Sequence, residues 1–318
     1  MHVIIGGGSG FIGTALAEAL TKRGDRVTLI SRKPGPGRIT WEDVSAGRVP
    51  RCDAVINLAG KHILDLRRRW TPAYRAEVIE SRVNTTTALV RALNAMESPP
   101  DVFVSTAGKC FYGTGEIGKV GTYPELHEDS APMGTDFPSE LVREWEDAAQ
   151  GIDDSRIRHV RLRIGIVLAD VERKTYPGKL WRIGRTRGVL PMLRLPFCLG
   201  IGASFGHGRQ PFPWIHIDDM VGILLHVIDR QDLSGRFNAV APSTTNNRAF
   251  SKSLAEHLNR PIRWTVPNWL VRLVIGDERA SILLEGQNVK PRRTLASGYR
   301  FRYPEIVTAL NDLVEITI

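Results

Sequence analysis

Short apolar runs alternate with longer segments of helical periodicity in the first half of the chain. The strand-like runs cover residues 2–5, 26–31, 54–58, 101–106 and 159–168. The helix-like stretches between them cover residues 14–23, 72–95 and 139–150. Strands that alternate with amphipathic helices build a parallel sheet covered on both faces, with right-handed crossovers. The pattern predicts an α/β fold with a Rossmann-type, doubly wound parallel sheet.

The pattern loosens after residue 168. Gly and Pro become frequent from residue 177 to residue 213. Helical stretches return at residues 218–229, 247–258, 269–275 and 304–314. We expect residues 1–168 to form the core of the Rossmann domain. Residues 169–318 are expected to form mainly a smaller C-terminal substrate lobe, partly interleaved with the Rossmann sheet.

The composition limits the classes of protein to which the chain can belong. With 318 residues, of which 42% are hydrophobic, the chain can bury a substantial core. A net charge of +9 favours anionic ligands, but without a nucleic-acid-binding motif it does not predict a nucleic-acid partner. The three cysteines, Cys52, Cys110 and Cys198, have no metal-ligand spacing and suit a reducing compartment, so no metal site is expected. The oligomeric state stays open, with a homodimer as one option.

The sequence shows neither a membrane segment nor a targeting segment. No apolar run approaches the roughly 18 residues that a membrane-spanning helix needs. The chain enters its first predicted strand at residue 2, which leaves no room for a signal or transit peptide before the fold. We therefore expect an intracellular, cytoplasmic location.

A glycine-rich turn follows the first predicted strand. Residues 6–13 read Gly-Gly-Gly-Ser-Gly-Phe-Ile-Gly, which gives Gly7, Gly10 and Gly13 the spacing G-x-x-G-x-x-G. These glycines permit a tight turn, the approach of backbone N–H groups to a pyrophosphate, and close packing of helix on strand. Phe11 and Ile12 lie in this turn and are also expected to contact the cofactor, and the N-terminus of the helix that follows faces the phosphates with its partial positive charge. Strand, glycine turn and helix in this order predict a dinucleotide site.

The end of the second predicted strand bears on which dinucleotide binds. An NAD site commonly has an acidic residue here that bonds the ribose 2′-hydroxyl, whereas this chain has Ser31 and Arg32. An arginine can hold a 2′-phosphate through charge-assisted bonds or stack on the adenine. The sequence therefore predicts NADP as the cofactor. The alternative is a solvated basic turn before the Pro-Gly-Pro-Gly of residues 34–37.

Several motifs together resemble one family. They lie at residues 6–13, 31–41, 57–60, 145–146, 213–219 and 284–291. With them the chain is similar, over nearly its whole length, to the extended, atypical short-chain dehydrogenase/reductases called epimerase family proteins. Residues 31–37 look most like the animal members. The resemblance implies a Rossmann domain with NADP and an oxidoreductase or nucleotide-sugar-epimerase-like activity on an unidentified small-molecule substrate.

The resemblance implies further cofactor contacts, which are Leu58, Ala59, Gly60, Glu77, Arg82 and Val167. Residues 58–60 match the motif whose backbone lines the adenine and ribose. Glu77 and Arg82 match helix positions that approach the cofactor, although from the sequence alone they are more often solvated helix charges. Val167 matches a strand position near the nicotinamide.

The usual catalytic pair of this superfamily is missing. Ordinary members use Tyr-x-x-x-Lys, but none of the six tyrosines has a lysine four positions later. Ser105, Thr106 and Tyr112 are the polar candidates that remain near the end of a predicted strand. The hydroxyls could bond a substrate carbonyl, and Tyr112 could donate a proton if a cation such as Lys109 lowers its pKa. The alternative is that all three have structural roles.

Two residues are candidates for the substrate side. His216, in Pro-Trp-Ile-His-Ile-Asp-Asp at residues 213–219, resembles the histidine that organises this side of the cleft in extended members. Asp218 suits the N-cap of the next helix. Arg209 could reach an anionic substrate, or it could be a surface arginine.

Two functions remain open. The first is an NADP-dependent oxidoreductase or epimerase-like enzyme, and the second is a non-catalytic NADP(H)-binding sensor or scaffold. The missing Tyr-Lys pair favours the second, and the retained motif at residues 213–219 favours the first. A basic stretch at residues 172–187, with six Lys or Arg and one acid, could be a lid, an anion-binding surface or a disordered insertion.

Overall fold

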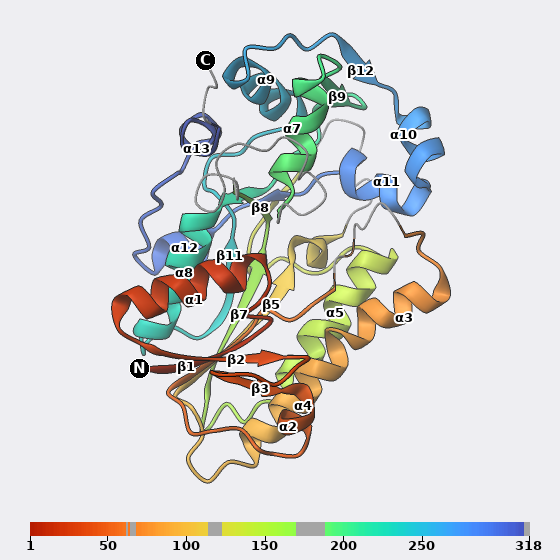
Figure 1. The fold of residues 1–318 in the computed structure, drawn as a ribbon. Coiled ribbons are helices and arrows are strands. Elements are labelled where there is room, and N and C mark those ends of the chain that lie inside the picture. The colour runs from red at the N-terminus through yellow and green to blue at the C-terminus, as the bar shows by residue number, and fades with distance from the viewer. Residues whose placement is uncertain (62, 64–67, 114–122, 170–187, 315–318) are drawn as a thin grey trace. The chain divides into compact units, whose positions relative to one another are not determined.

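The computed structural model describes residues 1–61, 63, 68–113, 123–169 and 188–314 (Figure 1). The basic stretch at residues 172–187 lies outside these ranges. The chain divides into two compact units, each drawn from several segments. The first unit comprises residues 1–111, 140–163 and 221–237, and the second comprises residues 112–139, 164–220 and 238–318.

A seven-stranded sheet forms the centre of the first unit, in the order β11-β7-β5-β4-β1-β2-β3. Its strands are β1 (His2–Gly6), β2 (Arg26–Ser31), β3 (Arg38–Thr40), β4 (Ala54–Asn57), β5 (Val102–Gly108), β7 (Arg158–Ile164) and β11 (Gly235–Ala239). The pairings among β1 to β5 are all parallel. Strand β1 lies between β2 and β4, so the strand order reverses beside it. Ligands of doubly wound sheets bind at the carboxyl ends of strands at such a point.

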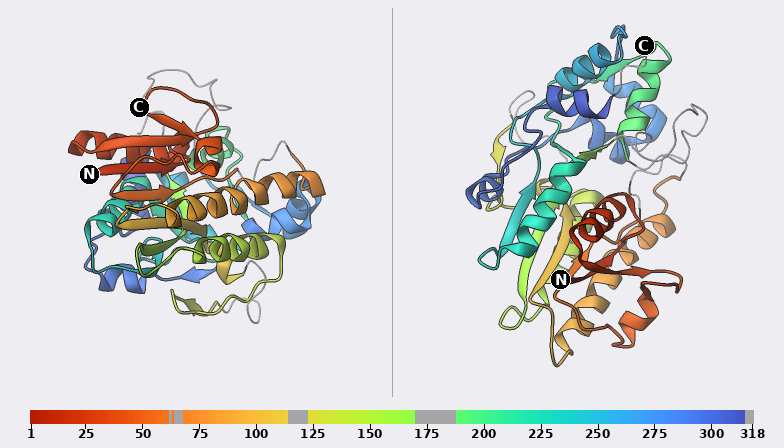
Figure 2. Two further views of the ribbon diagram at one scale, coloured as in Figure 1. Left: turned by 90° about the horizontal axis from the view of Figure 1, so that it is seen from below. Right: turned by 60° about the vertical axis from the view of Figure 1, so that its left-hand side comes forward.

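Helices cover both faces of this sheet (Figure 2). Helices α2 (Trp41–Ser45), α4 (Val83–Asn94) and α5 (Phe137–Gln150) share one core cluster with alternate strand residues such as Ile4, Val55 and Phe103. Because side chains alternate along a strand, the intervening strand residues face the other side. There α1 (Phe11–Arg23) and α8 (Ile217–Asp229) are neighbours, and Arg23 of α1 pairs with Asp229 of α8 at 2.7 Å (Figure 1). The predicted doubly wound α/β sheet is confirmed.

Two predicted elements are each split in two. The strand expected at residues 159–168 ends at Ile164 and resumes as β8 (Ile166–Leu168) in a different sheet. A Cβ on Gly165 would lie 2.8 Å from the carbonyl oxygen of Pro213, so the crossing backbone leaves room only for glycine. The helix expected at residues 72–95 is divided at Ser81 and Arg82 into α3 (Pro72–Glu80) and α4.

The second unit contains three short parallel strand pairs. Strand β8 pairs with β10 (Trp214–His216), β9 (Ala203–Phe205) with β12 (Trp264–Val266), and β6 (Glu125–Leu126) with β13 (Asn288–Val289). The helices are α7 (Leu190–Cys198), α9 (Asn247–His257), α10 (Asn268–Ile275), α11 (Asp277–Leu284), α12 (Arg292–Ala296) and α13 (Ile306–Leu313). The main core of the unit gathers around Trp214, Phe250, Leu254 and Leu310.

Periodicity located α8, α9, α10 and α13 but missed several elements. Helices α7 and α11 and strand β11 carry no clear signal of their own, and β11 joins the edge of the large sheet from the second half of the chain. Among the described residues, no helix is long and apolar enough to cross a membrane. The described part of the chain also contains no group of His, Cys, Asp or Glu side chains that could hold a metal ion.

Candidate functional site

The glycine turn after β1 is shaped by close backbone contacts. Gly7 has a φ of +72°, and a Cβ there would lie 2.6 Å from the carbonyl oxygen of Leu58. A Cβ on Gly13 would lie 2.5 Å from the carbonyl oxygen of Gly7 and 2.6 Å from Cα of Gly8. Each contact is closer than real Cβ atoms come, so the first and third glycines of the spacing are required by geometry. The turn therefore brings the ends of β1 and β4 together at the point where the strand order reverses.

Helix α1 begins directly at this turn. Gly10 is its N-cap and has no side chain to accept a hydrogen bond from the first turn. No acidic residue lies in that turn, while Phe11 and Ile12 are half-buried there. Helix N-termini with uncapped N–H groups favour anions through both hydrogen bonds and the helix dipole. A pyrophosphate fits this cradle, which side chains at the glycine positions would fill.

The end of β2 presents a cation to solvent. Ser31 is half-buried, and its hydroxyl donates a hydrogen bond to the carbonyl oxygen of Lys33, which closes the turn. Arg32 is exposed, and its guanidinium has no hydrogen bond or ion pair within the described part of the chain. No described residue competes for its donors, so they are available to an anionic group such as a 2′-phosphate.

The backbone after β4 is held by the buried amide of Asn57, which belongs to the motif at residues 57–60 but was not among the predicted cofactor contacts. Asn57 is fully buried, and its Oδ1 accepts a hydrogen bond of 3.1 Å from the N–H of Ala59. Its Nδ2 donates to the Thr86 hydroxyl at 2.9 Å, which also accepts a bond of 3.1 Å from the indole of Trp145. This network fixes residues 58–60, in which Ala59 is 7% exposed and Gly60 is exposed. The sequence signal that could have identified this network is an asparagine at the end of an apolar strand.

Arg82 and Glu77 occupy different environments beside this segment. Arg82 donates a 2.7 Å bond to the carbonyl oxygen of Lys61, and its guanidinium lies 3.0 Å from where a Cβ of Gly60 would be. Burial lowers the pKa of Arg82 to about 10. Glu77 is bound by Lys61 and by Arg68, the latter at 3.0 Å, and these bonds lower its pKa to about 2. Arg82 thus borders the predicted cofactor segment, whereas Glu77 is an anion neutralised by two cations.

The hydroxyls of Ser105 and Thr106 already have protein partners. Thr106 donates a 2.7 Å bond to the carbonyl oxygen of Asn57. Ser105 lies 2.9 Å from Nε2 of His159, a residue of β7 that the sequence did not mark as functional. Both hydroxyl residues are only 3% exposed. Burial lowers the pKa of His159 to about 3, so the ring stays neutral, stacked on Phe103. These contacts match the alternative interpretation, in which the hydroxyls of Ser105 and Thr106 have structural roles at the end of the strand.

Tyr112 ends a 3-10 helix, η1 (Lys109–Tyr112), and is fully buried within the second unit. Its hydroxyl donates a 2.8 Å hydrogen bond to Oδ1 of Asn238. The amide of Asn238 in turn donates to the carbonyl oxygen of Lys290 at 2.9 Å, and its backbone N–H donates to Glu128 at 3.1 Å. The Tyr112 hydroxyl is therefore a member of a buried network and not a group presented to solvent.

The motif at residues 213–219 is also committed to the fold of the second unit. His216 is 1% exposed and caps α8, because its Nδ1 accepts a 3.0 Å bond from the N–H of Asp218. Asp218 was expected to be this cap and instead lies in the first turn. The Nε2 of His216 is 3.3 Å from Asp312, and burial lowers the pKa of the ring. The sequence hypothesis of a substrate-facing His216 stays a prediction, and the geometry favours a structural role.

Asp219 binds the C-terminal segment to α8. Its Oδ1 accepts bonds from the Tyr299 hydroxyl at 3.0 Å and from the N–H of Arg302 at 2.7 Å, and its Oδ2 accepts from the N–H of Tyr303 at 2.9 Å. Asp219 is 1% exposed.

Val167, the predicted contact near the nicotinamide, is half-buried in β8, opposite Ile215 of β10. Neither Val167 nor Ile215 has a polar side chain.

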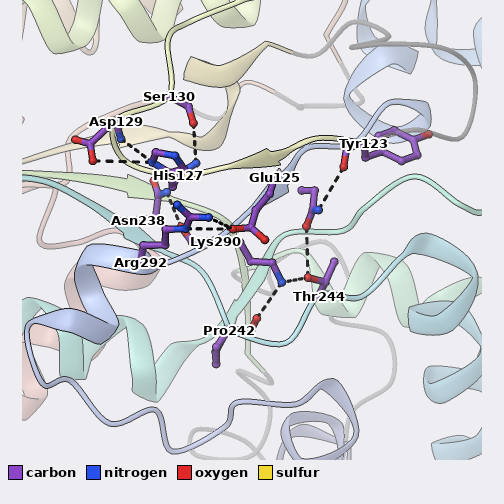
Figure 3. A network of polar contacts seen from close by, with 11 residues as sticks. Tyr123, Glu125, His127, Asp129, Ser130, Asn238, Pro242, Thr244, Lys290 and Arg292 are labelled. Carbon is purple, nitrogen blue, oxygen red and sulfur yellow. Dashed lines mark hydrogen bonds and ion pairs between the residues drawn. The ribbon is translucent and has the colours of Figure 1, made fainter.

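Arg209 lines a pocket that lies wholly within the second unit. The cavity volume is about 310 Å³. The lining residues are Tyr123, Arg209, Pro211, Thr244, Thr245, Asn246, Ala249 and Asn288. Figure 3 shows the adjoining network, in which Lys290 reaches Thr244 and Glu125 faces Arg292. The asparagines and threonines of this wall come from segments far apart in the chain, so no local signal marked them.

Comparisons with known proteins agree with this geometry. The profile described as the NAD dependent epimerase/dehydratase family matches residues 3–133, and a domain of unknown function, DUF1731, matches residues 266–313. The chain is 45% identical over 315 residues to the epimerase family protein SDR39U1 of Bos taurus, covering 99% of this chain and 100% of that protein. The Homo sapiens protein of the same name is 43% identical over 314 residues, with the same coverage.

A solved structure has a closely similar fold. It is the crystal structure of human epimerase family protein SDR39U1 (isoform 2) with NADPH. The TM-score is 0.88 at 42% sequence identity, and the match covers 99% of each chain. The glycine turn and the sheet order therefore occur here in a chain whose fold is that of an NADPH-bound protein.

Proposed function

Because the chain belongs to the epimerase family, we propose that it is an NADP(H)-dependent oxidoreductase acting on a small substrate. The observation that carries this proposal is the uncapped N-terminus of α1 beside the glycine turn, together with the unpaired Arg32 at the end of β2. The first fits a pyrophosphate and the second a 2′-phosphate. The human relative crystallised with NADPH supports the same cofactor.

The residues of this chain bind and orient the cofactor in this proposal. When bound, NADP(H) supplies or accepts a hydride at the nicotinamide. The N–H groups at the start of α1 bind the pyrophosphate, and Arg32 binds the 2′-phosphate and selects against NAD(H). Asn57 holds the backbone of residues 58–60, along which the adenosine lies. This backbone excludes water from one side of the ligand.

One observation favours a second candidate, a non-catalytic NADP(H)-binding sensor or scaffold. The three hydroxyls predicted to contact the substrate each form a hydrogen bond inside the protein, Ser105 with His159, Thr106 with Asn57, and the predicted proton donor Tyr112 with Asn238. A general acid must reach the substrate proton directly or through one water. Under the oxidoreductase proposal, the proton therefore comes from another group or from water.

The cofactor part is tested by titrating the protein with NADPH and with NADH. Arg32→Asp should weaken NADPH binding at least about 100-fold, because it replaces a charge-assisted bond by repulsion, and should change NADH binding by less than about threefold. Arg26→Asp is the matched control, since Arg26 is exposed at the opposite end of the same strand. Equal losses for the two nucleotides would contradict the 2′-phosphate role of Arg32.

The choice between the two candidates needs turnover measurements. We expect NADPH oxidation with at least one compound in a panel of aldehydes, ketones and keto acids, with product formed in equal amount. Tight NADPH binding without oxidation by any compound of the panel would favour the sensor or scaffold.

A further inference from the structure

We propose that the pocket of the second unit is a binding subsite for the carboxylate or phosphate group of a small organic anion, contacted by Arg209. The proposal rests on the proposed function in that this anion would be the substrate. It is carried by the charge and donors of the lining residues and by the size of the pocket.

Arg209 supplies a cation that has no partner among the described residues. The residue is exposed, and its guanidinium forms no hydrogen bond or ion pair within the described ranges. Its backbone is held in place, because its N–H donates a 3.0 Å bond to Nδ1 of His207. An arginine whose backbone is fixed and whose guanidinium is unpaired can bind a carboxylate or phosphate with two parallel hydrogen bonds.

The loop that carries Arg209 is clamped to the start of α9. The N–H groups of Arg248 and Asn247 donate to the carbonyl oxygens of Gly208 and Gln210 at 2.9 and 3.0 Å. The N–H of Phe212 donates to the carbonyl oxygen of Thr245 at 2.8 Å. These bonds on both sides of Arg209 hold the two walls of the pocket together. The site is therefore largely formed before a ligand binds.

The other lining residues supply a neutral donor. The Oδ1 of Asn246 caps α9 by accepting a 2.8 Å bond from the N–H of Ala249, which leaves its Nδ2 as the donor. The Thr244 hydroxyl donates a 3.4 Å bond to Oδ1 of Asn288 and accepts a bond from Lys290, and Nδ2 of Asn288 donates a 3.4 Å bond to the carbonyl oxygen of Tyr123. The Nδ2 of Asn246 therefore adds an amide donor to the arginine, and the two together match the oxygen atoms of an oxyanion.

The surrounding charges favour an anion. None of the described residues that line the pocket carries a carboxylate. The neighbouring carboxylate, Glu125, lies opposite Asn288 in the β6–β13 pair and is neutralised by Arg292 at 2.6 Å. Two more cations, Arg248 and Lys290, flank the lining segments. An unneutralised positive field in a concave site raises the local concentration of anions.

The volume of the pocket limits the size of the ligand that it can hold. Its volume of about 310 Å³ is at the lower end of the range of about 300–1,000 Å³ that is typical of small-molecule sites. A small acid or phosphate monoester fits such a space, whereas a nucleoside diphosphate sugar would extend out of it. The pocket therefore favours a compact anion.

Calorimetric titration with inorganic phosphate and with malonate tests the proposal. Both titrations are made on the full chain at constant ionic strength and without NADPH. We expect saturable binding to the wild-type protein and at least about tenfold weaker binding to Arg209→Gln, because the paired charge-assisted bonds are lost. Arg209→Lys should retain part of the affinity. Arg260→Gln, which removes an exposed arginine of the same unit outside the pocket, should bind within about twofold of wild type.

Three results would overturn the proposal. These are no saturable binding of either anion to the wild-type protein, equal losses in Arg209→Gln and Arg260→Gln, and Arg209-dependent binding of UDP-glucose at least about tenfold tighter than that of phosphate. Melting curves of each variant exclude unfolding as the cause. NADPH titrations run in parallel should be unchanged by Arg209→Gln, so a failure of NADPH binding would concern the proposed function and not this pocket.

Discussion

The hydroxyl of Tyr112 donates a 2.8 Å hydrogen bond to Oδ1 of Asn238, and both side chains are fully buried. The two residues are 126 positions apart in the sequence. The carbonyl oxygen of Asn238 also accepts a 2.8 Å bond from the Thr294 hydroxyl. Tyr112, which the sequence suggested as a proton donor, therefore connects distant segments of the second unit through a buried hydrogen bond.

Tyr112→Phe should lower the free energy of unfolding by about 1–3 kcal/mol, because Oδ1 of Asn238 is left buried without its donor. Urea unfolding followed by circular dichroism measures this change. A double-mutant cycle with Asn238→Ala should give a coupling energy of roughly 1 kcal/mol. NADPH turnover of the folded variant, once a substrate is found, should stay within about threefold of wild type. A loss of turnover at unchanged stability would instead support Tyr112 as the proton donor.

Gly7→Ala should destabilise the protein more than Gly24→Ala does. Both glycines have positive φ, +72° and +93°, so both variants pay for a left-handed backbone. At Gly7 the new Cβ also meets the carbonyl oxygen of Leu58 at 2.6 Å, whereas nothing lies within 4 Å at Gly24. We expect a difference of about 1–3 kcal/mol in the free energy of unfolding.

The same two variants should differ in cofactor binding. NADPH affinity should fall at least about tenfold in Gly7→Ala, because the clash displaces the turn that carries the N-terminus of α1, and should be nearly unchanged in Gly24→Ala. Fluorescence titration measures both affinities. Equal affinities in the two variants would show that this turn does not contact the cofactor.

Asp219→Ala should cost about 3 kcal/mol or more, measured by chemical unfolding. The change leaves the N–H groups of Arg302 and Tyr303 without their acceptor, and the Tyr299 hydroxyl keeps only its 3.1 Å bond to the main-chain carbonyl oxygen of residue 219. Asp219→Asn should recover part of the loss. Asp218→Ala is the matched neighbour, because this half-exposed carboxylate forms one 3.4 Å ion pair with Arg302 and should cost less than about 1 kcal/mol. Similar costs at the two positions would contradict the role given to Asp219.

Stability should fall with acidification in a way that depends on His159. An unfolded histidine takes up a proton below about pH 6.5, whereas burial keeps the folded ring neutral down to a pKa of about 3. Between these values the unfolded state binds more protons, so stability is lost as the pH falls. Each pH unit within this window should remove about 1.4 kcal/mol.

Unfolding curves of wild type and of His159→Phe at several pH values measure this contribution. The variant should be less stable at pH 7, because Ser105 loses its partner, but its stability should fall less steeply between pH 6 and pH 4. Parallel pH profiles for the two proteins would show that His159 does not titrate in this way.

Local pattern predicted the strands and the first helix well, because the determinants are adjacent in sequence. Strand β2 has the predicted bounds, and α1 differs only at its start. The errors lie where a distant segment intervenes. Gly165 divides the predicted strand because the backbone of Pro213 crosses it. Arg82 divides the predicted helix, and its guanidinium returns to the carbonyl oxygens of Lys61 and Val78.

The candidate site divides in the same way. The glycine spacing and Arg32 were readable because a turn, a helix start and a strand end are local features. The partners of Ser105, Thr106 and Tyr112 were not readable, since each hydroxyl binds a residue from another strand or another part of the chain. Residue type alone cannot say whether a hydroxyl faces a ligand or a buried acceptor.

The sequence by itself determined the alternation of strands and helices, the glycine turn and the positive charge at the end of the second strand, because each depends on neighbouring residues. Only the tertiary structure decided that Tyr112 and His216 are buried in structural networks and that Arg209 meets Asn246 and Asn288 around one pocket. Burial and hydrogen-bond partnership depend on which distant segments the fold brings together, and that information is not contained in any local stretch of the chain.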